Sequence, residues 1–202
     1  MIGLTLIVIL LLSLLIFGDR FCAENMAWPG LREYQKLRIC TLLDPMRDPL
    51  GAGFHTLQSI TAVGSGGIFG KGWLEGTQTQ LAFIPERSTD FVFSGYAEEF
   101  GFFGSLLLIL LYAGITLRGL WISIGAPTDF ARLLGGTLSM MTFTYACVNI
   151  GMVTGVLPVV GVPLPWMSYG GTALITLGIG VGLLMSIGKD RSETTQGFSL
   201  QK

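Results

Sequence analysis

The chain has 202 residues, of which 50% are hydrophobic and only 12% are Asp, Glu, Lys or Arg. Soluble domains carry about 25% charged residues, so this composition, with a mean hydropathy of +0.64, argues against a soluble enzyme and against a disordered chain. The net charge is −1, so no overall positive field indicates nucleic-acid binding. Cys22, Cys40 and Cys147 have no Cys-x-x-Cys spacing and predict neither a zinc site nor a disulfide framework. A single Cys22–Cys40 bridge would require that this stretch face an oxidising compartment.

Three uncharged runs divide the chain. They cover residues 1–17, 100–117 and 133–188. Because a membrane span needs about 20 apolar residues, the first two runs predict one helix each. The third is long enough for two helices, separated where Pro158, Pro163 and Pro165 lie among glycines. We therefore predict an all-α, polytopic membrane protein with four spans, at residues 1–18, 97–119, 132–156 and 165–188.

The charges outside these runs predict the orientation. Residues 1–18 are interpreted as a retained span rather than a signal peptide, because no Lys or Arg precedes the apolar run. The short loop 118–132 and the tail 189–202 are weakly positive, which favours a cytoplasmic position for both. The long loop 19–96 is then extracytoplasmic, and the polar tail is expected to be disordered.

Two segments of the long loop are rich in turn-forming residues. LLDPMRDPLGAG, residues 42–53, has two Asp-Pro steps that favour rigid turns. In GSGGIFGKGW, residues 64–73, glycines let backbone N–H groups approach an anion, and Lys71 adds a positive charge. It is not a Walker A loop, because Ser65 and Gly72 stand where that motif needs Gly and Ser or Thr. A phosphate-binding loop and a flexible connector are both open interpretations.

A third segment, FIPERSTDFVFSGYAEEFG at residues 83–101, leads into the second span. Ser88 or Thr89 can cap a helix here. An acid beside an apolar helix at the lipid boundary is a candidate functional residue. The alternative, an acid that only complements the helix dipole, suits Glu98 and Glu99 better than Asp90. At helical spacing Asp90 shares one small, polar face with Ser94, Ala97 and Gly101.

The remaining polar residues offer few catalytic alternatives. His55 is the only histidine and is expected to be interfacial or packed, which removes Ser-His-Asp catalysis as a simple option. Asn149, Ser168 and Tyr169 lie in predicted spans, where uncharged polar groups typically form hydrogen bonds between helices.

Four segments together carry a resemblance to a known family. LLDPMRDPLGAGFHTLQS, GSGGIFGKGWLEGTQTQL, IPERSTDFVFSGYAEEFG and VNIGMVTGVLPVVGVPLPWMSYGG resemble, in order and across nearly all of residues 20–188, the SEDS family of shape, elongation, division and sporulation proteins. Family members are about twice this length and have ten spans, so the chain is similar to their C-terminal part and is expected to be a fragment. Ser88 stands where the family often has His.

The resemblance implies a peptidoglycan glycosyltransferase that polymerises lipid II for cell elongation and rod shape. The 4-hydroxyl of an acceptor N-acetylglucosamine attacks C1 of a donor N-acetylmuramic acid with inversion, and undecaprenyl pyrophosphate leaves. Asp90 matches the family's catalytic aspartate, and a carboxylate can serve as the base that a hydroxyl nucleophile needs. A pyrophosphate leaving group needs positive charge, for which Lys71, Arg87 and Arg38 are predicted, with Gly66 and Gly67. A divalent cation, Mg²⁺ or Mn²⁺, is left open.

The resemblance also implies a multi-pass position in the bacterial inner membrane. The expected partners are lipid II, a class B penicillin-binding protein and other membrane proteins of the elongation complex, with no nucleic acid. Two alternatives stay open: a transporter or flippase for lipid II or another lipid, and a non-enzymatic scaffold. Transporters usually carry ionisable groups inside their spans, whereas the charges within the bounds predicted here, Glu98, Glu99, Arg118 and Arg132, lie at the span ends. The 202-residue chain alone is expected to be poorly active.

Overall fold

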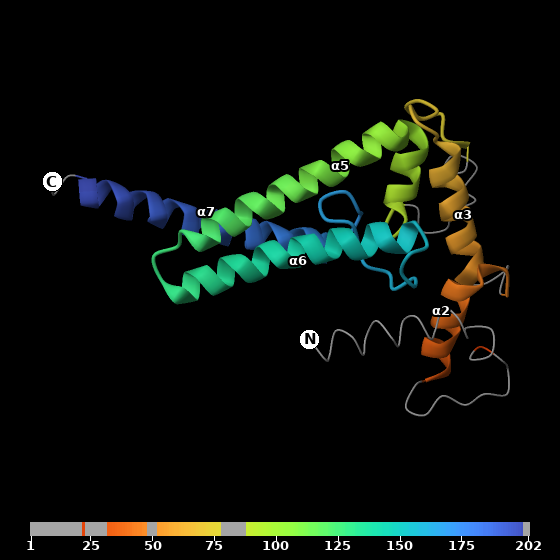
Figure 1. The fold of residues 1–202 in the computed structure, drawn as a ribbon, viewed down its shortest axis with the longest axis horizontal. Helices are drawn as coiled ribbons and strands as arrows, with labels where there is room; N and C mark the ends of the chain where they lie inside the picture. The colour runs from red at the N-terminus through yellow and green to blue at the C-terminus, as the bar shows by residue number, and fades with distance from the viewer. Residues whose placement is uncertain (1–21, 23–31, 48–51, 78–87, 200–202) are drawn as a thin grey trace, which may run out of the picture.

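The computed structural model describes Cys22 and residues 32–47, 52–77 and 88–199. All secondary structure within these ranges is helical, which confirms the predicted all-α class. The elements are α2 (Glu33–Leu43), the 3-10 helix η1 (Pro45–Arg47), α3 (Ala52–Ser65), α5 (Val92–Ile124), α6 (Asp129–Val153) and α7 (Gly171–Ser199). In Figure 1, α5 and α6 run side by side in opposite directions, and α2 and α3 lie at one end of the bundle.

Three of these helices are long and apolar enough to cross a membrane. They are Val92–Ile124, Asp129–Val153 and Gly171–Lys189. Only 22%, 28% and 17% of the residues in their most apolar windows are buried within the chain. The many apolar side chains left outside are suited to a lipid environment. The first predicted span, residues 1–18, lies outside the described residues.

Small residues let α5 and α6 approach closely. A Cβ atom at Gly119 of α5 would overlap the side chain of Ser139, and one at Gly135 of α6 would lie 3.2 Å from the Ser123 Cβ atom. Such small residues are typical of helix interfaces in membranes, where backbone approach increases van der Waals contact. At the tight turn between the two helices, the Ser123 hydroxyl donates a hydrogen bond to the Arg132 carbonyl.

The helix ends differ from the predicted span boundaries. α6 begins at Asp129, capped by Thr128, whose hydroxyl oxygen accepts a hydrogen bond from the Ala131 N–H at 3.2 Å. It ends at Val153, and α7 begins only at Gly171. The three prolines keep residues 154–170 non-helical, because proline lacks the N–H that a helix needs.

The C-terminal tail also differs from the prediction. α7 continues to Ser199, so the expectation of disorder in residues 190–202 is wrong for 190–199. No proline follows the span in this stretch, and Lys, Arg, Glu and Gln are good helix formers. A helix that has already nucleated in the span therefore extends through it.

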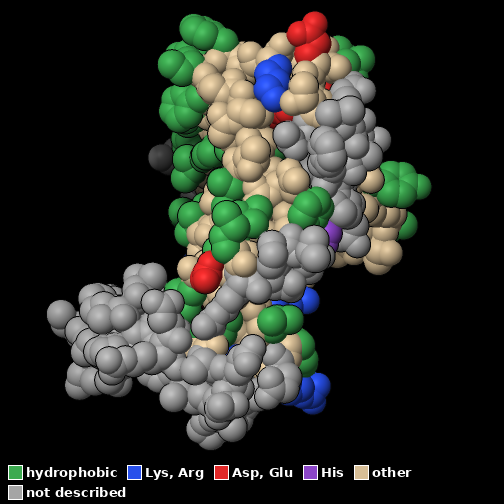
Figure 2. Space-filling model, turned by 90° about the vertical axis from the view of Figure 1, so that its right-hand side faces the viewer, with side chains coloured by type: hydrophobic (Ala, Val, Ile, Leu, Met, Phe, Trp, Pro, Cys, Tyr) green, Lys and Arg blue, Asp and Glu red, His purple; other side chains and the backbone are tan. Residues whose placement is uncertain are grey.

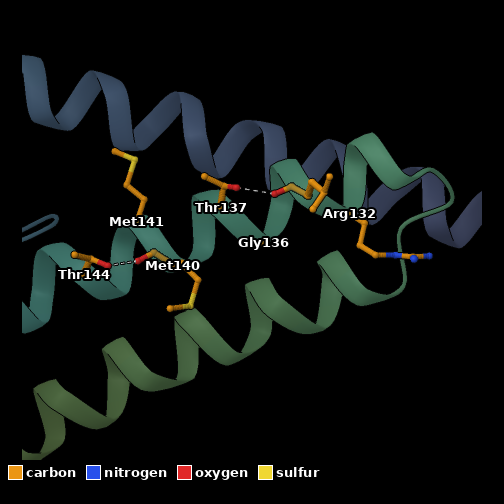
Figure 3. A pocket seen from close by; sticks show the side chains of 7 residues that line it. Arg132, Gly136, Thr137, Met140, Met141 and Thr144 are labelled. Atoms are coloured by element: carbon orange, nitrogen blue, oxygen red, sulfur yellow. Dashed lines mark hydrogen bonds between the residues drawn. The ribbon is translucent and has the colours of Figure 1, made fainter. Parts of the chain in front are cut away.

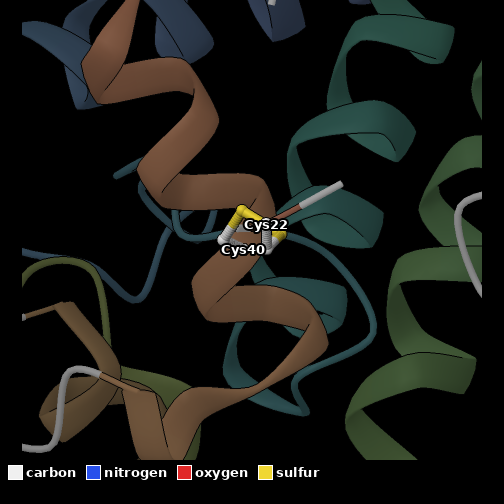
Figure 4. The surroundings of a disulfide bond; sticks show 2 residues. All are labelled: Cys22 and Cys40. Atoms are coloured by element: carbon white, nitrogen blue, oxygen red, sulfur yellow. A yellow bond between two sulfur atoms is a disulfide. The ribbon is translucent and has the colours of Figure 1, made fainter. Parts of the chain in front are cut away.

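The end of the molecule formed by α2 and α3 carries a disulfide. Cys22 is bonded to Cys40 of α2, with their Cα atoms 5.6 Å apart (Figure 4). The sequence analysis made this bridge conditional on an oxidising compartment, where disulfides form and persist. Figure 2 views the molecule from this side and shows hydrophobic side chains gathered along the upper left edge of the described surface.

Candidate active site

Asp90 lies in a turn immediately before α5. Residues 88–91 form the turn and Phe91 is the N-cap, without a side-chain cap hydrogen bond. The prediction that Ser88 or Thr89 caps the helix is therefore wrong. The Ser94 N–H donates to the Phe91 carbonyl at 3.0 Å, so the helical hydrogen bonds begin at Phe91, while the Asp90 carbonyl accepts a hydrogen bond from a distant side chain.

That distant side chain is Asn149 of α6. It is fully buried, and its amide nitrogen donates to the Asp90 carbonyl at 2.8 Å and to the Val162 carbonyl at 2.7 Å. One side chain thus ties the Asp90 turn and the loop 154–170 to the middle span. The expectation that Asn149 forms hydrogen bonds between segments rather than catalysing is consistent with this arrangement.

The loop 154–170 lies against the Asp90 side chain. A Cβ atom at Gly161, where φ is +78°, would lie 3.0 Å from Asp90 Oδ2, so glycine suits both the backbone conformation and the close approach of the carboxylate. On the other side of the turn, the Tyr169 N–H donates to the Ser88 carbonyl at 2.8 Å. The backbone of the turn is therefore held by hydrogen bonds from two different elements, α6 and this loop, and the Asp90 carboxylate lies beside Gly161.

After the Asp90 turn in sequence, α5 is interrupted at Gly101, which has φ +65° and ψ −157°. The two broken ends leave backbone groups without helical partners. The glycine-rich segment 64–77 supplies them: Lys71 N–H donates to the Glu98 carbonyl and Gly72 N–H to the Glu99 carbonyl, both at 3.1 Å.

The same segment also satisfies the second half of α5. There, the Phe102 N–H donates to the Gly67 carbonyl at 2.9 Å and the Phe103 N–H to the Ile68 carbonyl at 3.3 Å.

The glycines of this segment allow that contact. A Cβ atom at Gly66 would overlap the Ala97 carbonyl, and one at Gly70 would overlap the Glu99 carbonyl. Their position next to α5 backbone therefore explains why small residues are needed here. Segment 64–77 is packed on α5 rather than being a free connector.

Lys71 forms an ion pair with Glu98 of α5, with 2.7 Å between Nζ and Oε1. The Glu98 side chain is fully buried and the Lys71 side chain is 27% exposed. The prediction that Glu98 only complements a helix dipole is wrong, because its carboxylate is removed from water and paired. Lys71 was predicted to bind the pyrophosphate, but its side chain is paired with Glu98. Glu98 follows Asp90 by eight residues, which corresponds to about 12 Å along a helix.

The other predicted cations lie elsewhere or are not described. Arg38 is exposed on α2 and lines a narrow recess between α2, α3 and the loop that follows α6. Arg87 lies outside the described residues and is placed only by sequence, three residues before Asp90. Within the described ranges, no group of three or more His, Cys, Asp or Glu could hold a metal ion. His55 packs on Phe91, with 6.1 Å between the ring centroids.

A hollow on the surface of α6 lies away from Asp90. It is lined by one face of α6 from Arg132 to Thr144, without a carboxylate (Figure 3). Arg132 precedes Asn149 by 17 residues on the same helix, so the two ends lie about 25 Å apart. Figure 3 shows Arg132 directed toward the α5–α6 turn. The arrangement around Asp90 is therefore the better candidate for chemistry.

The FtsW/RodA/SpoVE family model, described as cell cycle protein, matches residues 1–193. The peptidoglycan glycosyltransferase MrdB of Escherichia coli K12 is 57% identical over 157 residues, which are 78% of this chain and 42% of MrdB. The peptidoglycan glycosyltransferase RodA of Treponema pallidum is 44% identical over 78% of this chain and 36% of its own length. Stage V sporulation protein E of Bacillus subtilis is 40% identical over 77% of this chain and 42% of its own length.

A solved structure is similar as well. One chain of a structure titled "Structural coordination of polymerization and crosslinking by a peptidoglycan synthase complex" has a TM-score of 0.66 and 34% identity. The match covers 92% of this chain and 48% of that chain. The chain thus spans less than half the length of each of these proteins. It belongs to the FtsW/RodA/SpoVE family of cell cycle proteins, as a multi-pass protein of the bacterial inner membrane.

Proposed function

We propose that the protein containing this chain is a peptidoglycan glycosyltransferase that polymerises lipid II and uses Asp90 as general base. The observation that supports this most strongly is the placement of a carboxylate beside Gly161, at the N-terminal end of a half-helix that leads into a span. The relatives named as peptidoglycan glycosyltransferases are up to 57% identical over this region. A lipid-tailed substrate needs its reacting groups at the membrane surface, and the Asp90 turn precedes a span.

In the proposed reaction, the Asp90 carboxylate accepts the proton of the acceptor 4-hydroxyl as its oxygen bonds to C1 of the donor sugar. The bond from C1 to the phosphate oxygen breaks, and undecaprenyl pyrophosphate leaves with the electron pair. The positive end of the α5 half-helix favours the ionised carboxylate, because the helix dipole stabilises negative charge there. The described residues offer no cluster of metal ligands, so no step is assigned to Mg²⁺ or Mn²⁺.

The leaving pyrophosphate requires positive charge where negative charge develops. We assign this role first to Arg87, because it precedes Asp90 by three residues, and second to Arg38, which is exposed on α2. Lys71, Gly66 and Gly67 complete the set predicted for the pyrophosphate, although Lys71 already contacts Glu98. Ser88, where the family often has His, contributes its carbonyl to the Tyr169 contact.

The proposed partner is a transpeptidase of the class B penicillin-binding type, together with other membrane proteins of the elongation complex. The similar solved structure is titled as a complex that coordinates polymerisation and crosslinking, and such coordination requires a crosslinking enzyme beside the polymerase. The apolar faces of the three described spans, most of which are not buried within the chain, offer surface for a further membrane helix. Co-purification from membranes with the intact protein tests this assignment.

The decisive test of the function separates polymerisation from transport. The intact protein, reconstituted in vesicles, receives fluorescent lipid II in the outer leaflet, and glycan products and leaflet exchange are measured in parallel. Glycan formation without accelerated exchange is the expected result. Exchange without glycan would favour the transporter, and neither activity would favour the scaffold.

A further inference from the structure

Glu98 is the one described carboxylate that is completely removed from solvent, although it lies where α5 enters the apolar part of the chain. A buried charge is costly unless a partner and further hydrogen bonds compensate it. Catalysis by Asp90, as proposed above, does not use Glu98. The contacts of Glu98 therefore call for a separate explanation.

The partners of Glu98 come from both ends and the middle of segment 64–77. Its Oε1 atom accepts hydrogen bonds from Lys71 Nζ at 2.7 Å and Thr77 Oγ1 at 3.1 Å, with Ser65 Oγ at 3.5 Å. Lys71 Nζ also donates to Thr77 Oγ1 at 2.8 Å. A Cβ atom at Gly76 would lie 3.0 Å from Glu98 Oε2, so the segment closes over the carboxylate. One carboxylate thus contacts three parts of the segment, in addition to the backbone hydrogen bonds that join the segment to α5.

The part of α5 that Glu98 occupies is the half-helix between the Asp90 turn and the break at Gly101. Because a helix of this length is stiff, the orientation of the half-helix at Gly101 determines the position of the Asp90 turn at its other end. The non-helical backbone at Gly101 does not fix that orientation, which therefore depends on the contacts with segment 64–77. The contacts of Glu98 therefore bear on the orientation of this half-helix and of the Asp90 turn at its start.

We propose that Glu98 and Lys71 form a positioning pair: the buried ion pair fixes the broken half of α5 and thereby holds Asp90 against Gly161 and Asn149. This rests on Asp90 being the catalytic base. It assigns Lys71 to Glu98 rather than to the leaving pyrophosphate. A displacement of about 1 Å at a catalytic group can cost about 100-fold in rate, so loss of the pair acts on turnover more than on substrate affinity.

Four variants in the intact protein test the pair by lipid II polymerisation: Lys71→Met, Glu98→Gln, the two combined, and Lys71→Arg. We expect each of the first two to lower kcat by about 10- to 100-fold with little change in KM. The combined variant is expected to be no worse than the poorer single variant, because the two residues act as one unit. Lys71→Arg retains the charge and is expected to recover most of the turnover. Glu75→Gln, an exposed acid in the same segment, serves as control and keeps normal kinetics.

A second measurement does not depend on activity. Ser88→Cys and Tyr169→Cys, placed in a Cys147→Ser background, bring two thiols to positions whose backbones are hydrogen-bonded. Their rate of disulfide formation reports whether the Asp90 turn keeps its place. We expect Glu98→Gln to slow it several-fold, while Glu75→Gln leaves it unchanged.

Three results would overturn the pair, whatever the fate of Asp90. A higher KM for Lys71→Met at unchanged kcat, with normal kinetics for Glu98→Gln, would make Lys71 a substrate-binding residue. Normal kinetics in every variant, or unchanged crosslinking in Glu98→Gln, would also remove the positioning role. Failure of the proposed function has a different signature, since Asp90→Asn would then polymerise normally while the crosslinking result stood unaffected.

Discussion

Gly161→Ala is expected to damage catalysis through a single methyl group. Gly161 has φ +78°, and its added Cβ atom would lie 3.0 Å from Asp90 Oδ2. A residue other than glycine in this backbone region costs about 1–2 kcal/mol. The carboxylate must also move by a few tenths of an ångström to relieve the contact. Since catalytic groups need placement within about 0.5 Å, we expect turnover to fall about 10-fold or more.

Gly155→Ala separates the two effects. Gly155 lies in the same loop with φ +74°, but its Cβ atom would meet the flexible end of Ile60 instead of Asp90. Thermal unfolding in detergent should show a similar loss, about 1–2 kcal/mol, for both variants. Lipid II polymerisation by the intact protein should fall only in Gly161→Ala. Equal turnover in the two variants would refute the claim that Gly161 shapes the position of the carboxylate.

Two further predictions concern the contacts around this site. Asn149→Asp keeps the shape but replaces the amide donor that bonds the Asp90 and Val162 carbonyls, so the free energy of unfolding should fall by about 2–5 kcal/mol; an unchanged melting temperature would contradict the buried role of Asn149. Under non-reducing conditions, a thiol reagent applied to denatured protein should label Cys147 alone, and should label Cys22 and Cys40 only after reduction. Labelling of all three thiols before reduction would show that the bridge is absent in the membrane.

Three of the four spans predicted from the sequence correspond to described helices that are long and apolar enough to cross a membrane, because lipid imposes long uncharged runs that composition reveals directly. It also predicted that the chain breaks between α6 and α7, since proline removes helix donors irrespective of tertiary context. The break inside α5 was not predicted. In the sequence, Gly101 is one small residue next to a continuous apolar run and gives no sign of a break. The break is stabilised by backbone hydrogen bonds from segment 64–77, about 30 residues earlier.

The sequence singled out Asp90, but not the residues that surround it in the structure. Asp90 stood out as an acid at the lipid boundary, a signal that depends on local sequence alone. Glu98 is also an acid at the lipid boundary, but together with its neighbour Glu99 it was interpreted as complementing the helix dipole. Its pairing with Lys71 depends on a contact 27 residues apart. The role of Gly161 could not be predicted from its proline-rich surroundings in the sequence, because it depends on the close approach of the Asp90 side chain from another segment.

The most direct test of the central claim is the polymerisation rate of Asp90→Asn in the intact protein. Asparagine keeps the shape of the side chain and removes its basicity, so the protein should reach the membrane in normal amount. Loss of a general base typically lowers the rate about 100- to 10,000-fold, and Glu99→Gln, measured beside it, should retain most of the activity. Near-normal glycan synthesis by Asp90→Asn would contradict the account and return the transporter and scaffold alternatives to first place.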